Sequence, residues 1–159
     1  MAKFQSNITL SDEINDTWRV ADGSGSSNQL TRVDAGKFVK LVGDSQMGLC
    51  AQGNEIEGLL VTADDIAPAD GFNLGSVQDS ERVLVTFDGL QATPGTGTIA
   101  IGDYVVCGTV VARGTALSGP PKVCKATGAA TTLNFKWRVI SILTGTGAVG
   151  GTGVIEMLG

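Results

Sequence analysis

Glycine interrupts this sequence so often that few stretches could hold a helix of ordinary length. The chain has 23 glycines in 159 residues, about twice the usual share. Only Met1 to Asp22, Ser76 to Asp88 and Ala129 to Thr144 run long without glycine or proline. We therefore expect an all-β fold, a small β-barrel or sandwich of short antiparallel strands, with glycines in the turns.

Hydrophobic alternation marks the individual strands. Val83, Val85 and Phe87 share one face of a segment in which Arg82 and Thr86 take the other. In the stretch 134–143 the apolar phase shifts after Val139, which predicts a β-bulge at that point. Similar patterns predict further strands at residues 38–42, 55–62, 104–112, 122–126 and 154–158.

The chain length fits one domain, preceded by an arm. Residues 22–28 read as a loop, as do 92–98 and 117–121. We therefore expect an N-terminal arm over residues 1–28, with one short helix over 12–17, and a barrel-like body over 29–159. The arm carries the side chains expected to contact a capsid or a neighbouring subunit: Phe4, Ile8, Leu10, Ile14, Trp18 and Arg19.

The two tryptophans call for different interpretations. Trp137 alternates with Phe135 and Val139, so we expect it in the core. Trp18 lies in the arm, where it could either cover the body or anchor the arm on another subunit. The sequence leaves both possibilities open for Trp18.

Charge and hydropathy exclude two classes of partner. The net charge of −5 and the scattered Lys and Arg residues argue against nucleic acid, because phosphate binding needs clustered cations. No apolar run approaches the ~20 residues that span a bilayer, and the first residues lack a signal-peptide pattern. We expect a soluble protein made in the cytoplasm, without membrane contact.

The sequence offers little for catalysis or metal binding. It has no histidine, which removes the commonest general base and metal ligand. Carboxylate chemistry is what remains, from Asp64, Asp65, Asp70, Glu81 or Asp88, and no pairing among them is favoured over ordinary surface solvation. The cluster around Asp64 lacks calcium-loop spacing. We expect no catalytic residue, cofactor, metal or small-molecule substrate, and no enzyme.

The three cysteines follow no metal-binding or redox spacing. Cys50, Cys107 and Cys124 are far apart in sequence, so we expect small buried core residues. A bridge between Cys107 and Cys124 stays open as an alternative.

One glycine-rich motif imitates a dinucleotide-binding loop. Gly145 to Gly150 matches G-x-G-x-x-G after a predicted strand, but no helix pattern and no acidic residue about twenty positions on follows. We therefore interpret residues 145–153 as the loop of a hairpin.

Two short segments repeat one pattern. Residues 35–40 and 101–106 each place a glycine, a polar residue, an aromatic and a valine at the start of a predicted strand. We expect each glycine to permit a tight turn before a strand whose aromatic side chain, Phe38 or Tyr104, enters the core.

Several of these segments together resemble the capsid decoration, or cement, proteins of tailed bacteriophages. The resemblance lies in residues 35–41, 57–61, 101–105, 137–140 and 154–158. It implies a small β-barrel-like domain that sits as a homotrimer on the capsid surface of the virion and clamps neighbouring major capsid proteins. The long N-terminal segment and the stretch 63–80 depart from the plainer family members.

Three other functions compete with capsid decoration. A tail or neck component of the virion would use the same β-rich, glycine-punctuated composition. A receptor- or glycan-binding module would need more exposed aromatic side chains than one tyrosine and two tryptophans provide. A carboxylate-dependent hydrolase is the third.

Overall fold

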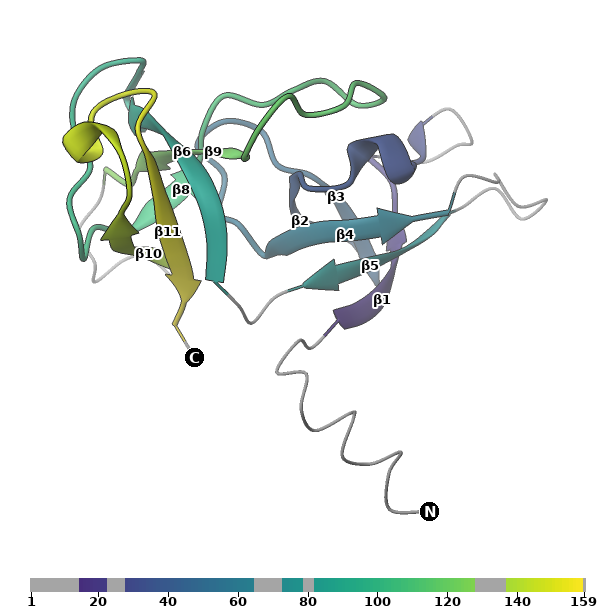
Figure 1. Ribbon diagram of the computed structural model, residues 1–159. Helices are drawn as coiled ribbons and strands as arrows, with labels where there is room; N and C mark the ends of the chain where they lie inside the picture. The colour runs from purple at the N-terminus through teal and green to yellow at the C-terminus, as the bar shows by residue number, and fades with distance from the viewer. Residues whose placement is uncertain (1–14, 23–27, 65–72, 79–81, 128–136, 159) are drawn as a thin grey trace.

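The protein has two β-lobes that pack side by side (Figure 1). A computed structural model describes residues 15–22, 28–64, 73–78, 82–127 and 137–158. In these ranges strands dominate and the named helical elements, η2 (Arg32–Asp34) and η3 (Gly145–Gly147), are 3₁₀ turns of three residues each, so the all-β prediction is confirmed. No helix within them is long and apolar enough to cross a membrane.

The first lobe, the N-terminal barrel, is a closed barrel of five strands in the order β1-β3-β2-β4-β5. All neighbours are antiparallel except β1 and β3, which are parallel. The 3₁₀ turn η2 (Arg32–Asp34) precedes β2. The strands are β1 (Asn15–Val20), β2 (Phe38–Gly43), β3 (Gln46–Leu49), β4 (Gly58–Ala63) and β5 (Leu74–Gln78).

The second lobe, the C-terminal sheet, has the strand order β10-β11-β6-β9-β8, with β7 paired to β6. A bridge between Tyr104 and Arg138 brings its two outer strands together. The pairs β6–β9 and β1–β3 are parallel, and the other strand pairs are antiparallel as expected. The elements are β6 (Arg82–Leu90), β7 (Thr93–Pro94), β8 (Val105–Cys107), β9 (Lys122–Lys125), β10 (Trp137–Ile142), η3 (Gly145–Gly147) and β11 (Thr152–Met157).

Each lobe has its own apolar core, and the larger core also joins the two lobes. Val20, Leu60 and Val77 belong to the core of the barrel. The core of the C-terminal sheet is built around Phe87 and Trp137, and it also takes in Phe38, Cys50 and Ile56 from the barrel side. Trp137 is fully buried, as the sequence predicted.

Hydrogen bonds fasten the junction between the lobes. The indole Nε1 of Trp137 donates to the carbonyl of Ile56 at 3.0 Å. The backbone of Cys107 accepts from Gly53 N at 2.8 Å and donates to Asn54 O at 2.9 Å. These hydrogen bonds give buried polar groups their partners. The junction therefore combines apolar packing with hydrogen bonds between the lobes.

The loop of residues 108–121, here named the clasp, reaches from the C-terminal sheet across the barrel (Figure 1). The carboxylate of Asp34, which is fully buried, accepts from Lys37 Nζ at 2.7 Å and from Gly114 N at 2.8 Å. Lys37 Nζ also donates to Ala112 O at 2.8 Å. At the start of the clasp, Thr109 N donates to Asp88 Oδ2 at 2.7 Å. Buried charges thus hold the clasp on both lobes.

The two lobes are structural repeats of each other. Strands β1 to β5 correspond in order to β6, β8, β9, β10 and β11, and the neighbours and their directions are the same throughout. The ladder between β2 and β4 corresponds to the bridge between Tyr104 and Arg138. The similar segments 35–40 and 101–106 therefore begin equivalent strands.

The repeat extends to individual residues. A β-bulge interrupts pairing between Leu60 and Thr62 in the barrel, and between Val139 and Ser141 in the sheet, where the sequence predicted one. Gly36 N donates to Leu60 O and Leu60 N to Lys37 O, at 2.7 and 2.9 Å. In the sheet, Gly102 N donates to Val139 O and Val139 N to Asp103 O, at 2.8 and 2.9 Å.

Two predictions about the N-terminal part need correction. Residues 15–20 form β1, which pairs with both β3 and β5, so this part of the predicted arm is a strand of the barrel. A helix is therefore absent over 15–17, because the backbone hydrogen bonds go to neighbouring strands instead. Residues 1–14 lie outside the described residues.

Two predictions in the body also need correction. Gly36 and Gly102 do have positive φ angles, of 83° and 91°, as the predicted turns require. Phe38 is buried as expected, against the core of the C-terminal sheet, but Tyr104 is 37% exposed. The strand predicted over 104–112 ends at Cys107, where the clasp begins.

Candidate partner-binding surface

The sequence-predicted contact residues Trp18 and Arg19 are consecutive in β1, and both line an open hollow of about 510 Å³. Asp16, Thr17, Ser45 and Leu74 complete its lining. Leu74 is 43% exposed. The other predicted contact residues, Phe4, Ile8, Leu10 and Ile14, lie outside the described residues.

Trp18 packs against the core of the barrel and also lines the hollow. It is half-buried and packs against the barrel core that contains Val20 and Leu60. It pairs across the ladder with Gly75 of β5. Of the two possibilities that the sequence left open, covering the body is the one that this packing confirms. Contact between Trp18 and another subunit stays a prediction.

A second depression, of about 400 Å³, runs between the clasp and the barrel. Its walls are mostly apolar, with Val42, Val110 and Val111 on them and Lys40 and Arg113 as the cations. Arg113 Nη1 donates to Asn28 Oδ1 at 3.2 Å, so it fixes the clasp. Asp22 and Cys50 also line it, but the Asp22 carboxylate accepts from Leu49 N at 2.6 Å, and the Cys50 thiol is buried with a raised pKa.

The three cysteines are buried thiols, as expected. Desolvation, with the Asp88 carboxylate nearby, raises the pKa of Cys124 to about 11. A hydrogen bond with the Cys107 thiol, followed by desolvation, raises the pKa of Cys50 above its ordinary value. Because the thiolate is the nucleophile, neither thiol is activated.

The bridge considered between Cys107 and Cys124 does not fit the sheet. Cys107 pairs with Val123, and Cys124 pairs with Val106, across the β8–β9 ladder. Side chains of adjacent residues in a strand point to opposite faces, so the two thiols face away from each other.

The acidic residues do not form a catalytic pair where the structure describes them. Asp88 is buried and holds Thr109 N, with Lys122 Nζ at 3.7 Å. Asp64 is exposed. Asp65, Asp70 and Glu81 lie outside the described residues. Within the described ranges, no group of three or more Cys, Asp or Glu side chains could hold a metal ion.

The glycine-rich motif at 145–150 is a hairpin loop, as predicted. It contains the single turn η3 and joins β10 to β11, which are antiparallel partners. A dinucleotide site needs a helix that opens at this loop, and the chain enters β11 instead.

Sequence reasoning missed two features of the surface. The clasp was read as part of a strand and a short loop, because Val110 and Val111 continue the apolar pattern of β8. The exposed pair of Tyr104 and Arg138 was missed because it needs two strands that are distant in sequence. The similarity of segments 35–40 and 101–106 was the one signal that pointed towards it.

Comparison of the chain with protein-family models, with curated proteins and with solved structures gave no match.

Proposed function

We propose that this protein is a non-enzymatic structural protein that binds the outer surface of a bacteriophage capsid and bridges adjacent major capsid proteins. The observation that carries the proposal is the structural repeat, in which two equivalent lobes are joined firmly to each other. A shell presents the same surface many times. A binder with repeated lobes can engage two copies at once, and linked contacts give strong attachment although each is modest.

The chemistry of the described residues supports a binding role. Their thiols have raised pKa values or are buried, and their buried carboxylates hold backbone amides and lysines. Four of the five segments that resemble decoration proteins lie at equivalent places in the two lobes, at the starts of β2 and β8 and in β4 and β10, and the fifth lies in β11.

The hollow at β1 is the proposed capsid contact. The half-buried Trp18 and Arg19 line it beside the exposed Leu74, and tryptophan and arginine are enriched among the residues that dominate interfaces. Phe4, Ile8, Leu10 and Ile14 precede β1 in sequence and extend this proposed contact. An acidic protein of net charge −5 would favour a basic capsid surface.

Co-sedimentation of the purified protein with expanded capsids of the encoding phage tests the proposal. We expect saturable binding, and a loss of about ten-fold or more in affinity for Leu74→Asp, which places a carboxylate in the hollow. Leu143→Asp is the matched control, because Leu143 is 55% exposed on the other lobe.

Three outcomes would contradict the proposal or its contact site. Failure of the wild-type protein to bind expanded capsids excludes decoration. Electron microscopy that places the protein at the tail or neck assigns it to another part of the virion. Equal losses for Leu74→Asp and Leu143→Asp would show that the hollow is not the contact.

A further inference from the structure

The structural repeat allows each surface of one lobe to be compared with its equivalent on the other. Phe38 and Leu59 are paired on the barrel, and they pack against the core of the C-terminal sheet. This pair is here named the inner face. The equivalent pair is Tyr104 and Arg138, here named the outer face. Both residues of the outer face are exposed.

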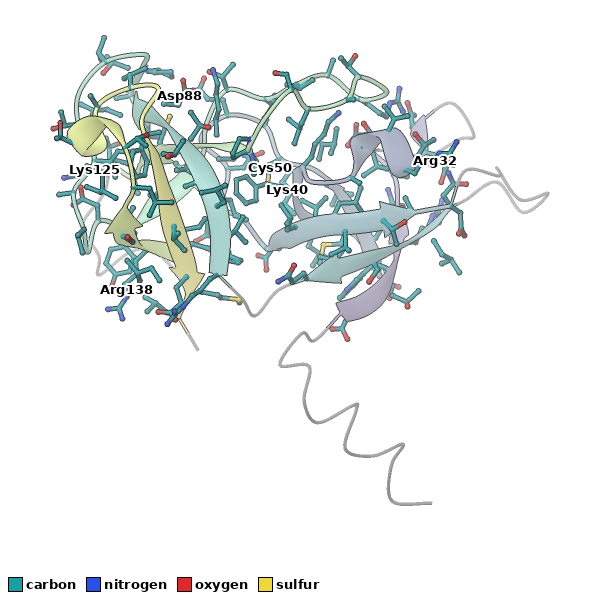
Figure 2. The ribbon with its side chains drawn as sticks, in the orientation of Figure 1. Arg32, Lys40, Cys50, Asp88, Lys125 and Arg138 are labelled. Carbon is teal, nitrogen blue, oxygen red and sulfur yellow. The ribbon has the colours of Figure 1, made fainter. Side chains whose placement is uncertain are left out.

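The outer face lies where its two side chains are exposed, unlike those of the inner face. Figure 2 shows Arg138 on the side of the C-terminal sheet that faces away from the barrel. Tyr104 is 37% exposed, whereas its equivalent Phe38 is 3% exposed. The inner face is therefore covered within the chain, whereas both side chains of the outer face are exposed in the described part of the chain.

The surface of the C-terminal sheet that packs against the inner face also has an equivalent on the barrel, and that equivalent is exposed. On the C-terminal sheet, Val83 and Cys107 belong to the core cluster that includes Phe38, and they are 5% and 3% exposed. We name this pair the covered rim. Strand pairing makes Asp16 the equivalent of Val83, and Leu41 the equivalent of Cys107.

Asp16 and Leu41 form the open rim. Leu41 is 56% exposed, among the highest values for a large apolar side chain in the described part of the chain, and Asp16 is exposed too. One interface is thus complete inside the molecule, while the two halves of an equivalent interface are exposed at different places.

Where the internal interface has two apolar side chains, the two exposed surfaces carry side chains of opposite charge. Inside the chain the positions hold Leu59 on the face and Val83 on the rim, both apolar. On the exposed halves the same positions hold Arg138 and Asp16. An arginine and an aspartate can form a charge-assisted pair across an interface, and they would repel a copy in the wrong orientation.

We propose that the outer face of one copy of this chain binds the open rim of a second copy, with Tyr104 against Leu41 and Arg138 paired with Asp16. The interface is head-to-tail, so it generates a closed ring or a chain of copies. It repeats between molecules the contact that the two lobes make within one molecule. The inference does not depend on capsid binding, since it concerns association in free solution.

Charge reversal tests the proposed pair in the full-length protein by sedimentation velocity over a range of concentrations. We expect Arg138→Glu and Asp16→Arg each to weaken self-association about ten-fold or more. The double variant restores the pair with its charges exchanged, and it should associate like the wild type. Arg32→Glu is the control, an exposed arginine in η2 that belongs to neither surface. Circular dichroism checks that all variants are folded.

A cross-linking experiment identifies what covers the open rim. Leu41→Cys is labelled with a benzophenone maleimide, which the buried native thiols do not take up, and the product is mapped by mass spectrometry after illumination. We expect cross-links to residues around 104 and 138 of another copy. Cross-links to residues 1–14 of the same chain would make that segment the occupant and overturn the proposal.

Three sedimentation results would also overturn it. These are a wild-type protein that stays monomeric at every concentration, single variants that associate like the wild type, and a double variant that fails to recover. Binding to capsids is measured separately, so a monomer that still decorates capsids would refute this inference and leave the proposed function standing.

Discussion

At the scale of single residues, the fully buried carboxylate of Asp34 is a critical group for stability. It accepts hydrogen bonds from Lys37 Nζ and from the backbone of Gly114 and Thr31. Asp34→Ala leaves the Lys37 ammonium buried without its carboxylate counter-ion, so we expect a loss of about 3–5 kcal/mol in the free energy of unfolding. Urea denaturation measures it.

The control for Asp34 is Asp44→Ala, in the exposed turn between β2 and β3. Its effect should stay within about 0.5 kcal/mol, as for other surface substitutions. A similar small effect for Asp34→Ala would mean that the clasp contributes little to stability.

Cys124 gives a prediction about pH. Its pKa is raised to about 11, so at pH 8 only about one thiol in a thousand is ionised. We expect native protein to react very slowly with a thiol reagent such as DTNB at pH 8, with Cys124 becoming faster as the pH approaches 11. Protein unfolded in guanidinium should release all three thiols at once. Rapid labelling of Cys124 in native protein at pH 8 would contradict the raised pKa.

At the scale of strands, the equivalent glycines Gly75 and Gly153 are needed where two strands pack closely. A Cβ on Gly153 would collide with the Phe87 ring and with Ser141 O, and a Cβ on Gly75 would lie 2.8 Å from Val20 Cγ1. We expect Gly153→Ala to cost about 1–3 kcal/mol by overpacking. Gly119→Ala is the control, since nothing lies within 4 Å of its added Cβ.

Thermal unfolding of Gly153→Ala and Gly119→Ala measures the cost of overpacking. Equal melting temperatures for the two variants would show that β11 can shift to accommodate the methyl group. Gly119 precedes Pro120 in the clasp, which is a loop. A lower melting temperature for Gly119→Ala would therefore report on the clasp rather than on strand packing.

The strands that the sequence predicted are those with a clear physical signature. Alternation identified β6, and the change of phase at Val139 identified the bulge in β10. Strand β1 was missed because its side chains Asp16, Trp18 and Val20 mix a charge with apolar groups on one face. Pairing with β3 and β5, which no local pattern encodes, makes it a strand.

At the scale of the whole molecule, the repeat was hardly visible in the sequence. Segments 35–40 and 101–106 showed it, but the connections between equivalent strands differ in length, so no constant period exists. A tight turn joins β2 to β3, while the clasp joins β8 to β9. The sequence predicted two residues of the hollow, Trp18 and Arg19. It missed Leu74 and Ser45, because these are distant in sequence and only folding brings them to the hollow.

The shared core predicts that both lobes unfold together. Phe38 is a barrel residue, yet its side chain lies in the core of the C-terminal sheet with Trp137. Phe38→Ala leaves a cavity there, so we expect a loss of about 3–5 kcal/mol and weaker amide protection in β8 and β10. Hydrogen exchange with mass spectrometry measures the protection, and calorimetry should still show one transition. Leu143→Ala, at an exposed site, is the control. Two separate transitions, or lost protection confined to the barrel, would mean that the lobes are independent, and the junction would then be too weak to serve as the pattern for contacts between copies.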